Sequence, residues 1–451
     1  MDYLITLLHS GLGNLAAYLA AHVLLCLLPA FVIAGAMTAL IPKASVTRWL
    51  GRATPPYVSY PAAAAAGSLL AVCSCTIVPL FAGIYRKGAG IGPAITFLFF
   101  APAGNILALA YTGGILGAEF AVARLLFCLV FGIGIGLLMA LLFRQDDAAH
   151  DQQTDALFAD KAVIGSAAKG LLLALVGLLI AGTLKMDWLT QTMGHFSLPI
   201  SGASAWQAQL LKWVPFDPSK GEEGVSAQGS VLILLLILIG VTAWKGMENI
   251  IEGANRWTWL SLLLSALTLL LATLKLSPSS TGLEIGVTGR VVAEALALMA
   301  AYWFARQLTP DDRQAWLWES WRFVKQIFPL LVAGVFVVGM ARQIIRPEWI
   351  ESWAGHNTLQ GNGIAVLFGI FMYFPTLVEV PVAKMFLDLG MHPGPLLAYL
   401  MADPELSLQS ILMTIAVIGR RKAFTYVAWV ALFSVIAGML FGAWVDAHAA
   451  G

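Results

Sequence analysis

Two groups of residues in apolar surroundings could carry chemistry in this chain. Cys73, Ser74 and Cys75 form a Cys-x-Cys run, and Glu379 stands alone in an apolar stretch. A thiolate is a soft ligand that prefers thiophilic ions. A carboxylate in an apolar stretch is costly to bury, so it is expected to carry a proton or to pair with a cation. These four residues are therefore the first candidates for a substrate-binding site.

The spacing of the two cysteines limits how they could act together. Side chains turn by about 100° per residue on a helix, so Cys73 and Cys75 would point apart there and could not share a ligand. In an extended or turning segment the two thiols can converge on one ligand. The alternative is that both cysteines are unrelated filler, as free cysteine packs like a small hydrophobe.

The composition places these residues in a membrane. Of the 451 residues, 59% are hydrophobic and 11% are charged, whereas soluble domains contain about 25% charged residues. Apolar runs of membrane-crossing length predict about 10 to 12 membrane elements, the first of them a retained span rather than a signal peptide. The net charge of +1 argues against nucleic acid as a partner. We expect a small-molecule substrate and membrane lipid as partners, no cofactor, and leave a homo-oligomer open.

An internal repeat organises the chain. The segment 67–102 returns without a gap 302 residues later as 369–404. Glycine and proline dominate the matched positions. Because these residues control backbone conformation, the two segments are expected to have the same backbone shape. The matched glycines and prolines are Gly67 and Gly369, Pro79 and Pro381, Gly88 and Gly390, Gly92 and Gly394, Pro93 and Pro395, and Pro102 and Pro404.

The repeat predicts an all-α polytopic membrane protein in four parts. Repeat one covers 1–143, a polar linker 144–162, inserted membrane spans and loops 163–322, and repeat two 323–451. The basic loop after repeat one's apolar arm has no basic counterpart in repeat two, which favours inverted repeats. No motif in the insert indicates chemistry.

The segment that carries the cysteines is predicted to enter and leave the membrane on one side. Basic residues precede the apolar stretch 56–84 and follow it at Arg86 and Lys87. Because basic residues favour the cytoplasmic side, a re-entrant hairpin with arms near 61–72 and 77–85 fits better than a single crossing. The Cys-Ser-Cys run would then lie at the tip. A tilted and kinked full span is the alternative.

Four prolines mark helix breaks in duplicated register. Pro79, Pro102, Pro381 and Pro404 each remove a backbone donor and free the carbonyl four residues earlier. A free carbonyl costs several kcal/mol in lipid, so such breaks persist where they face protein or a wet cavity. Transporters build binding sites at repeat interfaces in this way. The alternative is a simple kink relieved by a neighbouring hydroxyl.

Three further polar residues near the breaks have two interpretations each. Asn105 follows Pro102 and could line the site or cap a helix. Asp403 precedes Pro404 and could take part in coupling, as Glu379 could, or cap a helix. Lys384 is a weaker coupling candidate, because Asp388 lies one turn beyond it and offers an ordinary surface ion pair.

The two proline-marked segments resemble a known family. Cys73 to Cys75 with Val78-Pro79-Leu80, and the second segment 375–381 ending in Glu379-Val380-Pro381, are similar to the predicted-permease family that includes the ArsP-type organoarsenical efflux permeases. The resemblance covers both repeats. It implies a permease of the bacterial-type inner membrane, with Cys73 and Cys75 as ligands of a metalloid substrate and Glu379 as a coupling or gating residue.

The leading hypothesis is a permease that exports a small thiophilic solute, such as a trivalent organoarsenical, from a site between the repeats. A membrane thiol oxidoreductase that cycles Cys73 and Cys75 through a disulfide is a minor alternative, since no second cysteine pair could relay electrons. A permease or channel without thiol chemistry is the third. The chain carries no Walker motif, so an ion gradient is the expected energy source.

Overall fold

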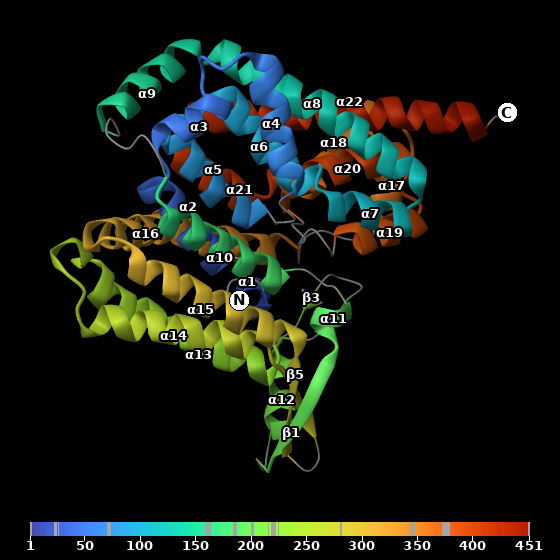
Figure 1. The fold of residues 1–451 in the computed structure, drawn as a ribbon. Coiled ribbons are helices and arrows are strands. Elements are labelled where there is room, and N and C mark those ends of the chain that lie inside the picture. The colour runs from blue at the N-terminus through green and yellow to red at the C-terminus, as the bar shows by residue number, and fades with distance from the viewer. Residues whose placement is uncertain are drawn as a thin grey trace.

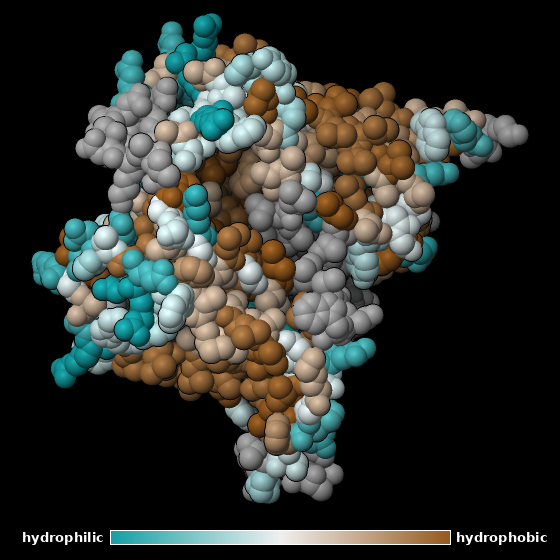
Figure 2. Space-filling view, in the orientation of Figure 1, coloured by the Kyte–Doolittle hydropathy of each residue, from teal (hydrophilic) through white to brown (hydrophobic). Residues whose placement is uncertain are grey.

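A computed structural model describes residues 2–21, 25, 27–69, 74–157, 164–183, 187–199, 203–214, 216–217, 222–223, 225–279, 282–342, 348–371 and 379–449. Helices dominate these residues, which confirms the predicted all-α polytopic class. Six helical segments are long and apolar enough to cross a membrane, and two bent helix pairs raise that number to eight within the described ranges. The apolar flanks of α8 (Ala118–Leu142) and α13 (Ala227–Met247) are exposed, as lipid-facing surfaces are (Figure 2).

The two repeats contain the same succession of helices. Repeat one comprises α2 (Leu28–Leu40), α3 (Lys43–Leu50), α4 (Pro56–Leu69), α5 (Ser74–Arg86), α6 (Ile91–Ala103), α7 (Ile106–Ile115) and α8. Repeat two comprises the end of α16 (Pro310–Arg342), α17 (Glu348–Ala354), α18 (Leu359–Phe371), α19 (Glu379–Asp388), α20 (Pro393–Leu406), α21 (Leu408–Ile418) and α22 (Arg420–Ala449).

Close backbone approaches are duplicated as well. A Cβ added at Gly67 on α4 would lie 3.1 Å from the amide nitrogen of Ala101 on α6, and one added at Gly369 on α18 would lie 3.0 Å from that of Asp403 on α20. Because both contacts are backbone contacts, the glycines allow α4 to pack on α6 and α18 to pack on α20 in the same way. The predicted duplication of backbone shape is therefore present in three dimensions.

Equivalent helices of the two repeats run in opposite directions. Phe120, near the start of α8, packs on Phe441 near the end of α22, and Phe131 stacks on Phe433. At the other end of the pair, Arg421 at the start of α22 lies over the ring of Phe143. Since α8 and α22 occupy the same place in their repeats and are antiparallel, the repeats are inverted, as the sequence predicted. Figure 1 shows the two helices side by side.

Both ends of the α4–α5 segment lie at one end of the molecule. The amide of Gly90, just after α5, donates to the carbonyl of Leu50, just before α4, at 2.8 Å. Repeat two has the matching bond from His392 to Ala354 at 3.0 Å. Helices α4 and α5 have 14 and 13 residues, or about 20 Å each, against about 30 Å of hydrocarbon. These contacts favour the re-entrant hairpin over the kinked full span.

The insert begins after the polar helix α9 (Arg144–Leu157), which lies over the α5–α6 turn. It contains α10 (Ser166–Thr183), α11 (Asp187–Thr190), α12 (Ala203–Trp213), α13, η3 (Ile250–Glu252), α14 (Arg256–Thr273) and α15 (Gly289–Gln307). The N-terminal helix α1 (Asp2–Ala21) packs along α16. Residue 323, where repeat two was predicted to begin, falls inside α16.

Two small sheets were not predicted. Strands β1 (Thr192–Leu198), β5 (Gly282–Thr288) and β4 (Lys275–Ser279) form an antiparallel sheet in that order, with Phe196 opposite Ile285 and Leu276 opposite Ile285. Strands β2 (Phe216–Asp217) and β3 (Glu222–Glu223) form a second pair. The larger sheet projects beyond the insert helices (Figure 1).

Candidate functional site

A buried ion pair joins the two repeats. The guanidinium of Arg124 on α8 donates through Nη2 to Oε1 of Glu379, the first residue of α19, at 2.5 Å. Neither side chain has any solvent exposure. A buried pair is stable only when both charges are well satisfied, and removing one partner leaves a costly unpaired charge. The contact therefore ties a helix of repeat one to the re-entrant segment of repeat two.

The other donors of Arg124 hold the helix break in repeat one. Its Nε donates to the carbonyl of Ala103, the last residue of α6, at 2.9 Å, and its Nη1 donates to Oγ1 of Thr112 on α7 at 3.1 Å. The hydroxyl of Thr112 in turn donates to the carbonyl of Ala108. One arginine thus binds both sides of the α6–α7 break and Glu379, so movement of any of these elements must rearrange it.

A second buried carboxyl lies beside this pair. Glu405, near the end of α20, accepts a hydrogen bond at 2.6 Å from the hydroxyl of Tyr426 on α22. Glu405 is 5% exposed and lies within electrostatic range of Glu379. Among the described residues, no hydrogen bond reaches Oε1 of Glu405 or Oε2 of Glu379. Glu379 therefore pairs with the guanidinium, Glu405 pairs with the Tyr426 hydroxyl, and each carboxyl leaves one oxygen open.

Sulfur completes the cluster. Cys128 follows Arg124 by one helical turn, is fully buried, and lies with its Sγ 3.7 Å from Sδ of Met401 on α20. Arg124, Glu379 and Glu405 all act electrostatically on this thiol. We call Arg124, Cys128, Glu379, Met401, Glu405 and Tyr426 the interface cluster, because α8 comes from repeat one and the other helices from repeat two.

The structure describes only part of the Cys73–Cys75 run that the sequence suggested as a binding site. Cys73 lies outside the described residues, and Ser74 and Cys75 form the first turn of α5, with side chains outside the described set. Substrate binding and metalloid ligation by Cys73 and Cys75 stay predictions. Their segment leads into α5, which packs against α21 of repeat two, just as α19 packs against α7 of repeat one. The structure thus brings each re-entrant segment to the opposite repeat.

Asn105 lies at the helix break after Pro102 and serves as a helix cap. Its Oδ1 accepts from the amide of Ala108 at 2.8 Å, and its Nδ2 donates to the carbonyls of Ala101 and Pro102. These bonds satisfy backbone groups that the break leaves open. The equivalent position in repeat two, Ser407, instead donates to the hydroxyl of Ser410. The geometry supports the cap interpretation for Asn105.

The four prolines lie inside helices at matched places. Pro79 lies within α5 and Pro381 in the first turn of α19, while Pro102 and Pro404 lie near the ends of α6 and α20. Helices α20 and α21 meet at an angle of 47°. Helices α6 and α20 end shortly after Pro102 and Pro404, whereas α5 continues through Pro79. The interface cluster packs against the ends of α6 and α20.

The two remaining coupling candidates differ in environment. Lys384 pairs with Asp388 at 2.6 Å, and both side chains are exposed, so this is the ordinary surface pair that the spacing also allowed. Asp403 is fully buried on α20, where Gly369 of α18 approaches its backbone. Of these candidates, Glu379 and Asp403 lie in the protein interior and Lys384 does not.

Sequence reasoning missed Arg124, although a signal was present. Arg124 is the only basic residue within the apolar helix Ala118–Leu142, and a charged residue inside a membrane span marks a functional site by default. Glu405 lies beside Pro404, and from the sequence helix capping and transport chemistry are equally open for it. Its partner Tyr426 lies on another helix, so no spacing pattern connects the two.

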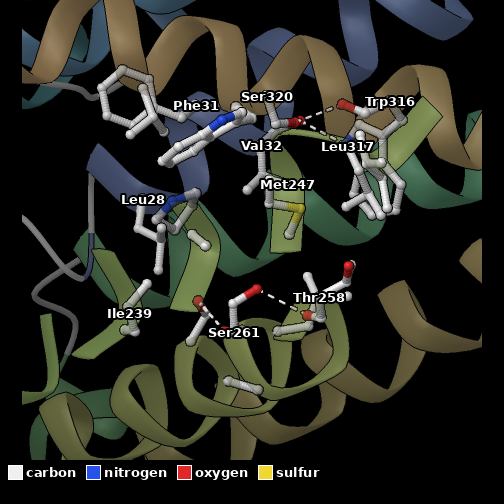
Figure 3. Close-up of a pocket in the computed structure, with 18 of the residues that line it drawn as sticks. Leu28, Phe31, Val32, Ile239, Met247, Thr258, Ser261, Trp316, Leu317 and Ser320 are labelled. Carbon is white, nitrogen blue, oxygen red and sulfur yellow. Dashed lines mark hydrogen bonds between the residues drawn. The ribbon is translucent and has the colours of Figure 1, made fainter. Parts of the chain in front are cut away.

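The insert holds a separate cavity of about 650 Å³. Leu28 and Phe31 of α2, Ile239 of α13, Ser261 of α14 and Trp316 of α16 are among its lining residues (Figure 3). The lining is mainly apolar, and polar side chains in it bond to backbone carbonyls, as in the bonds from Ser261 to Thr258 within α14 and from Trp316 to Val32 between α16 and α2. Its walls come from the insert and from the first helices of the repeats, away from the interface cluster.

Inverted repeats, paired re-entrant segments and a buried charge cluster between them define a polytopic membrane transport protein. The chain belongs to a family described as predicted permeases, whose model matches residues 9–443, and it is a membrane permease. It is 33% identical to the UPF0718 protein MJ0584 of Methanocaldococcus jannaschii over 442 residues, 98% of each chain. It is also 29% identical to the UPF0718 protein YraQ of Escherichia coli over 125 residues, 28% of this chain and 36% of that one. No solved structure matches the chain.

Proposed function

We propose that this permease exports a small thiophilic solute, such as a trivalent organoarsenical, through a site between its two repeats. The observation that carries the proposal is the Arg124–Glu379 pair, which joins the re-entrant segment of one repeat to a spanning helix of the other. Transporters place substrate sites where such broken segments meet near the middle of the membrane. Here one segment carries Cys73 and Cys75, and the other carries Glu379.

The chemistry of the two segments supports a soft substrate. Two thiolates offer soft sulfur ligands, which favour a thiophilic centre over a hard oxyanion. A singly methylated trivalent arsenical has two positions for such ligands, one for each thiol of the Cys73–Cys75 run. We propose that substrate binds near the start of α5 and that Glu379 acts as the coupling or gating residue on the opposite side.

The ion pair suggests how access could alternate. Arg124 contacts the α6–α7 break and Glu379 at once, so opening the repeat interface would separate these contacts. Breaking a buried pair is costly unless both charges find new partners or one is neutralised. The pair would therefore act as a latch that holds the repeats closed between transport events.

The proposed location is the cytoplasmic membrane of a bacterial-type cell. Basic residues gather at one end of the repeats, where Lys422 at the start of α22 lies 3.8 Å from Asp146 at the start of α9 and near the ring of Phe143. Arg86 and Lys87 follow α5 at the same end. Positive residues favour the cytoplasm, so the cysteine-bearing segment would enter from the cytoplasmic side, as an exporter requires.

The direct test is uptake of trivalent methylarsenical into everted membrane vesicles. We expect accumulation with wild type and loss with Cys73→Ser and with Cys75→Ser. Cys26→Ser removes a thiol outside the motif and serves as the matched control. Glu379→Gln should bind the arsenical and fail to accumulate it. No accumulation by folded wild type would remove the arsenical from the proposal and direct attention to other soft solutes.

A further inference from the structure

The interface cluster has an unbalanced formal charge. Glu379 and Glu405 are two carboxyls within electrostatic range of each other, and Arg124, which pairs with Glu379, is the one guanidinium among the described residues that contacts either of them. With both carboxyls ionised the three groups sum to one negative charge. Burying a net charge at membrane depth is very costly, so the closed arrangement requires one more positive charge.

A proton fits this requirement better than a metal cation. The two open carboxylate oxygens, Oε2 of Glu379 and Oε1 of Glu405, are buried and have no hydrogen-bond partner within the described ranges. Cations such as sodium or calcium need several oxygen ligands, and calcium takes six to eight. The described residues include no group of three or more histidine, cysteine or acidic side chains arranged to hold a metal ion. A proton forms a covalent bond with a single carboxylate oxygen and needs no further ligand.

We propose that the interface cluster is a proton-binding site, that Glu405 holds the proton in the closed state, and that this proton is the coupling ion of the permease. The statement about the coupling ion rests on the proposed transport function, and the statements about the proton-binding site and Glu405 do not. Glu405 is chosen because Glu379 already has the guanidinium, whereas Glu405 has only the neutral hydroxyl of Tyr426 as a partner.

Charged and titratable groups surround Glu405, so its protonation state affects the interface cluster. They are Arg124 and Cys128 from α8, Glu379 from α19, Tyr426 from α22 and Asp403 from its own helix. When Glu405 loses its proton, it becomes a second anion within electrostatic range of Glu379. Repulsion between the two carboxylates destabilises the closed arrangement, so release of the proton favours opening. Binding of a proton restores a neutral, closed interface.

The proton site can be tested without any substrate. Infrared spectra of the purified full-length protein, titrated with pH in lipid, report the carbonyl stretch of protonated carboxyl groups. We expect a buried-carboxyl band at neutral pH that is lost in Glu405→Gln and shifted in frequency in Tyr426→Phe, which removes only the hydrogen bond. Glu284→Gln, on the exposed face of β5, is the matched control and should leave the band unchanged. A band that is absent, or that survives unshifted in both variants, would overturn the proton site.

Coupling is tested in vesicles with trivalent methylarsenical as the probe. Wild-type uptake should rise several-fold when a pH gradient is imposed. Glu405→Gln stays neutral like the protonated, closed interface, so it should abolish this rise and slow exchange of arsenical across the membrane. Wild-type uptake that ignores the gradient would overturn coupling while the transport function stands. Absence of any uptake beside a normal infrared band would overturn the arsenical assignment and the coupling built on it while the proton site stands.

Discussion

Gly88 and Gly390 hold the same left-handed backbone, with φ of 89° and 93°, at equivalent positions of the two repeats. Each follows its re-entrant segment and reverses the chain into the next helix. A second matched pair, Gly117 and Gly419, has φ of 105° and 84° before α8 and α22. Side chains strongly disfavour this region, so the two turns explain why glycine recurs at the same spacing in the sequence.

Replacing Gly88 or Gly390 with alanine should destabilise the protein by roughly 1–2 kcal/mol each, because alanine is strained in the left-handed region. Thermal unfolding of the purified protein in detergent measures the effect. Asparagine tolerates this region better, so Gly88→Asn should lose less stability than Gly88→Ala. Equal melting temperatures for wild type and Gly88→Ala would contradict the assigned turn.

The Arg124–Glu379 pair should show strong coupling in a double-mutant cycle. Arg124→Met or Glu379→Met alone leaves a buried charge without its partner and should cost about 3–5 kcal/mol. The double variant should lose much less than the sum, since methionine can pack against methionine without a buried charge. Chemical unfolding of all four proteins measures the cycle. Additive losses would show that the two side chains do not interact.

Helix α8 offers a sharp test of its packing on α6. A Cβ at Gly136 would lie 2.7 Å from the carbonyl oxygen of Gly92, whereas one at Gly134 meets nothing within 4 Å. Overpacking costs typically about 1–3 kcal/mol, so Gly136→Ala should lower the melting temperature. Gly134→Ala, two residues away on the same helix, should leave it unchanged. Gly438→Ala in α22 should behave like Gly136→Ala, because its Cβ would lie 2.6 Å from the carbonyl of Gly394.

Asp147 should give stability a pH dependence outside the membrane. Burial raises the pKa of this carboxyl above its ordinary 3.8, although the Ile91 amide, which donates to it at 2.9 Å, and nearby His150, Arg52 and Lys422 oppose the shift. The folded protein therefore holds this proton more tightly than the unfolded chain. The resulting stabilisation is present below the ordinary pKa and is lost as pH rises through the raised one.

Melting temperatures of wild type and Asp147→Asn across mildly acidic pH measure this pH-dependent stabilisation. Asparagine cannot ionise but can still accept from Ile91, so the variant should lose less stability than wild type as pH rises through this range. A steeper loss in the variant would reverse the sign and contradict the assignment.

The sequence predicts backbone shape better than it predicts which distant side chains contact each other. Glycine and proline constrain their own dihedral angles, so the duplicated segments and the helix ends near Pro102 and Pro404 are accessible from residue spacing. The inversion was predicted from the basic loop at Arg86 and Lys87, which has no basic counterpart in repeat two. Glu379 was predicted because a lone carboxylate is conspicuous in an apolar run. Its partner Arg124 is 255 positions away, and only the packing of α19 against α7 and α8 brings the two together.

The small sheet was missed for a related reason. Strand β1 pairs with β5 across about 90 residues, and β4, the other partner of β5, contains Pro278. Short strands with a distant partner or an internal proline leave little periodicity to detect. The loop near residues 190–228 was predicted to face solvent or an interface, and its first part forms the edge of a sheet.

The inversion of the repeats restricts how many times the insert can cross the membrane. Helix α8 ends beside α9 and the α5–α6 turn, where His150 stacks on Tyr85, and α16 starts at that same end, where Glu319 pairs with Arg86. The chain must therefore leave repeat one and reach repeat two on the same side, which only an even number of passages allows. Helices α13 and α14, the described insert helices that are long and apolar enough to cross a membrane, satisfy this parity. Loss of any one of them would reverse repeat two and align the two copies, so natural or engineered shortening of the insert should remove helices in pairs.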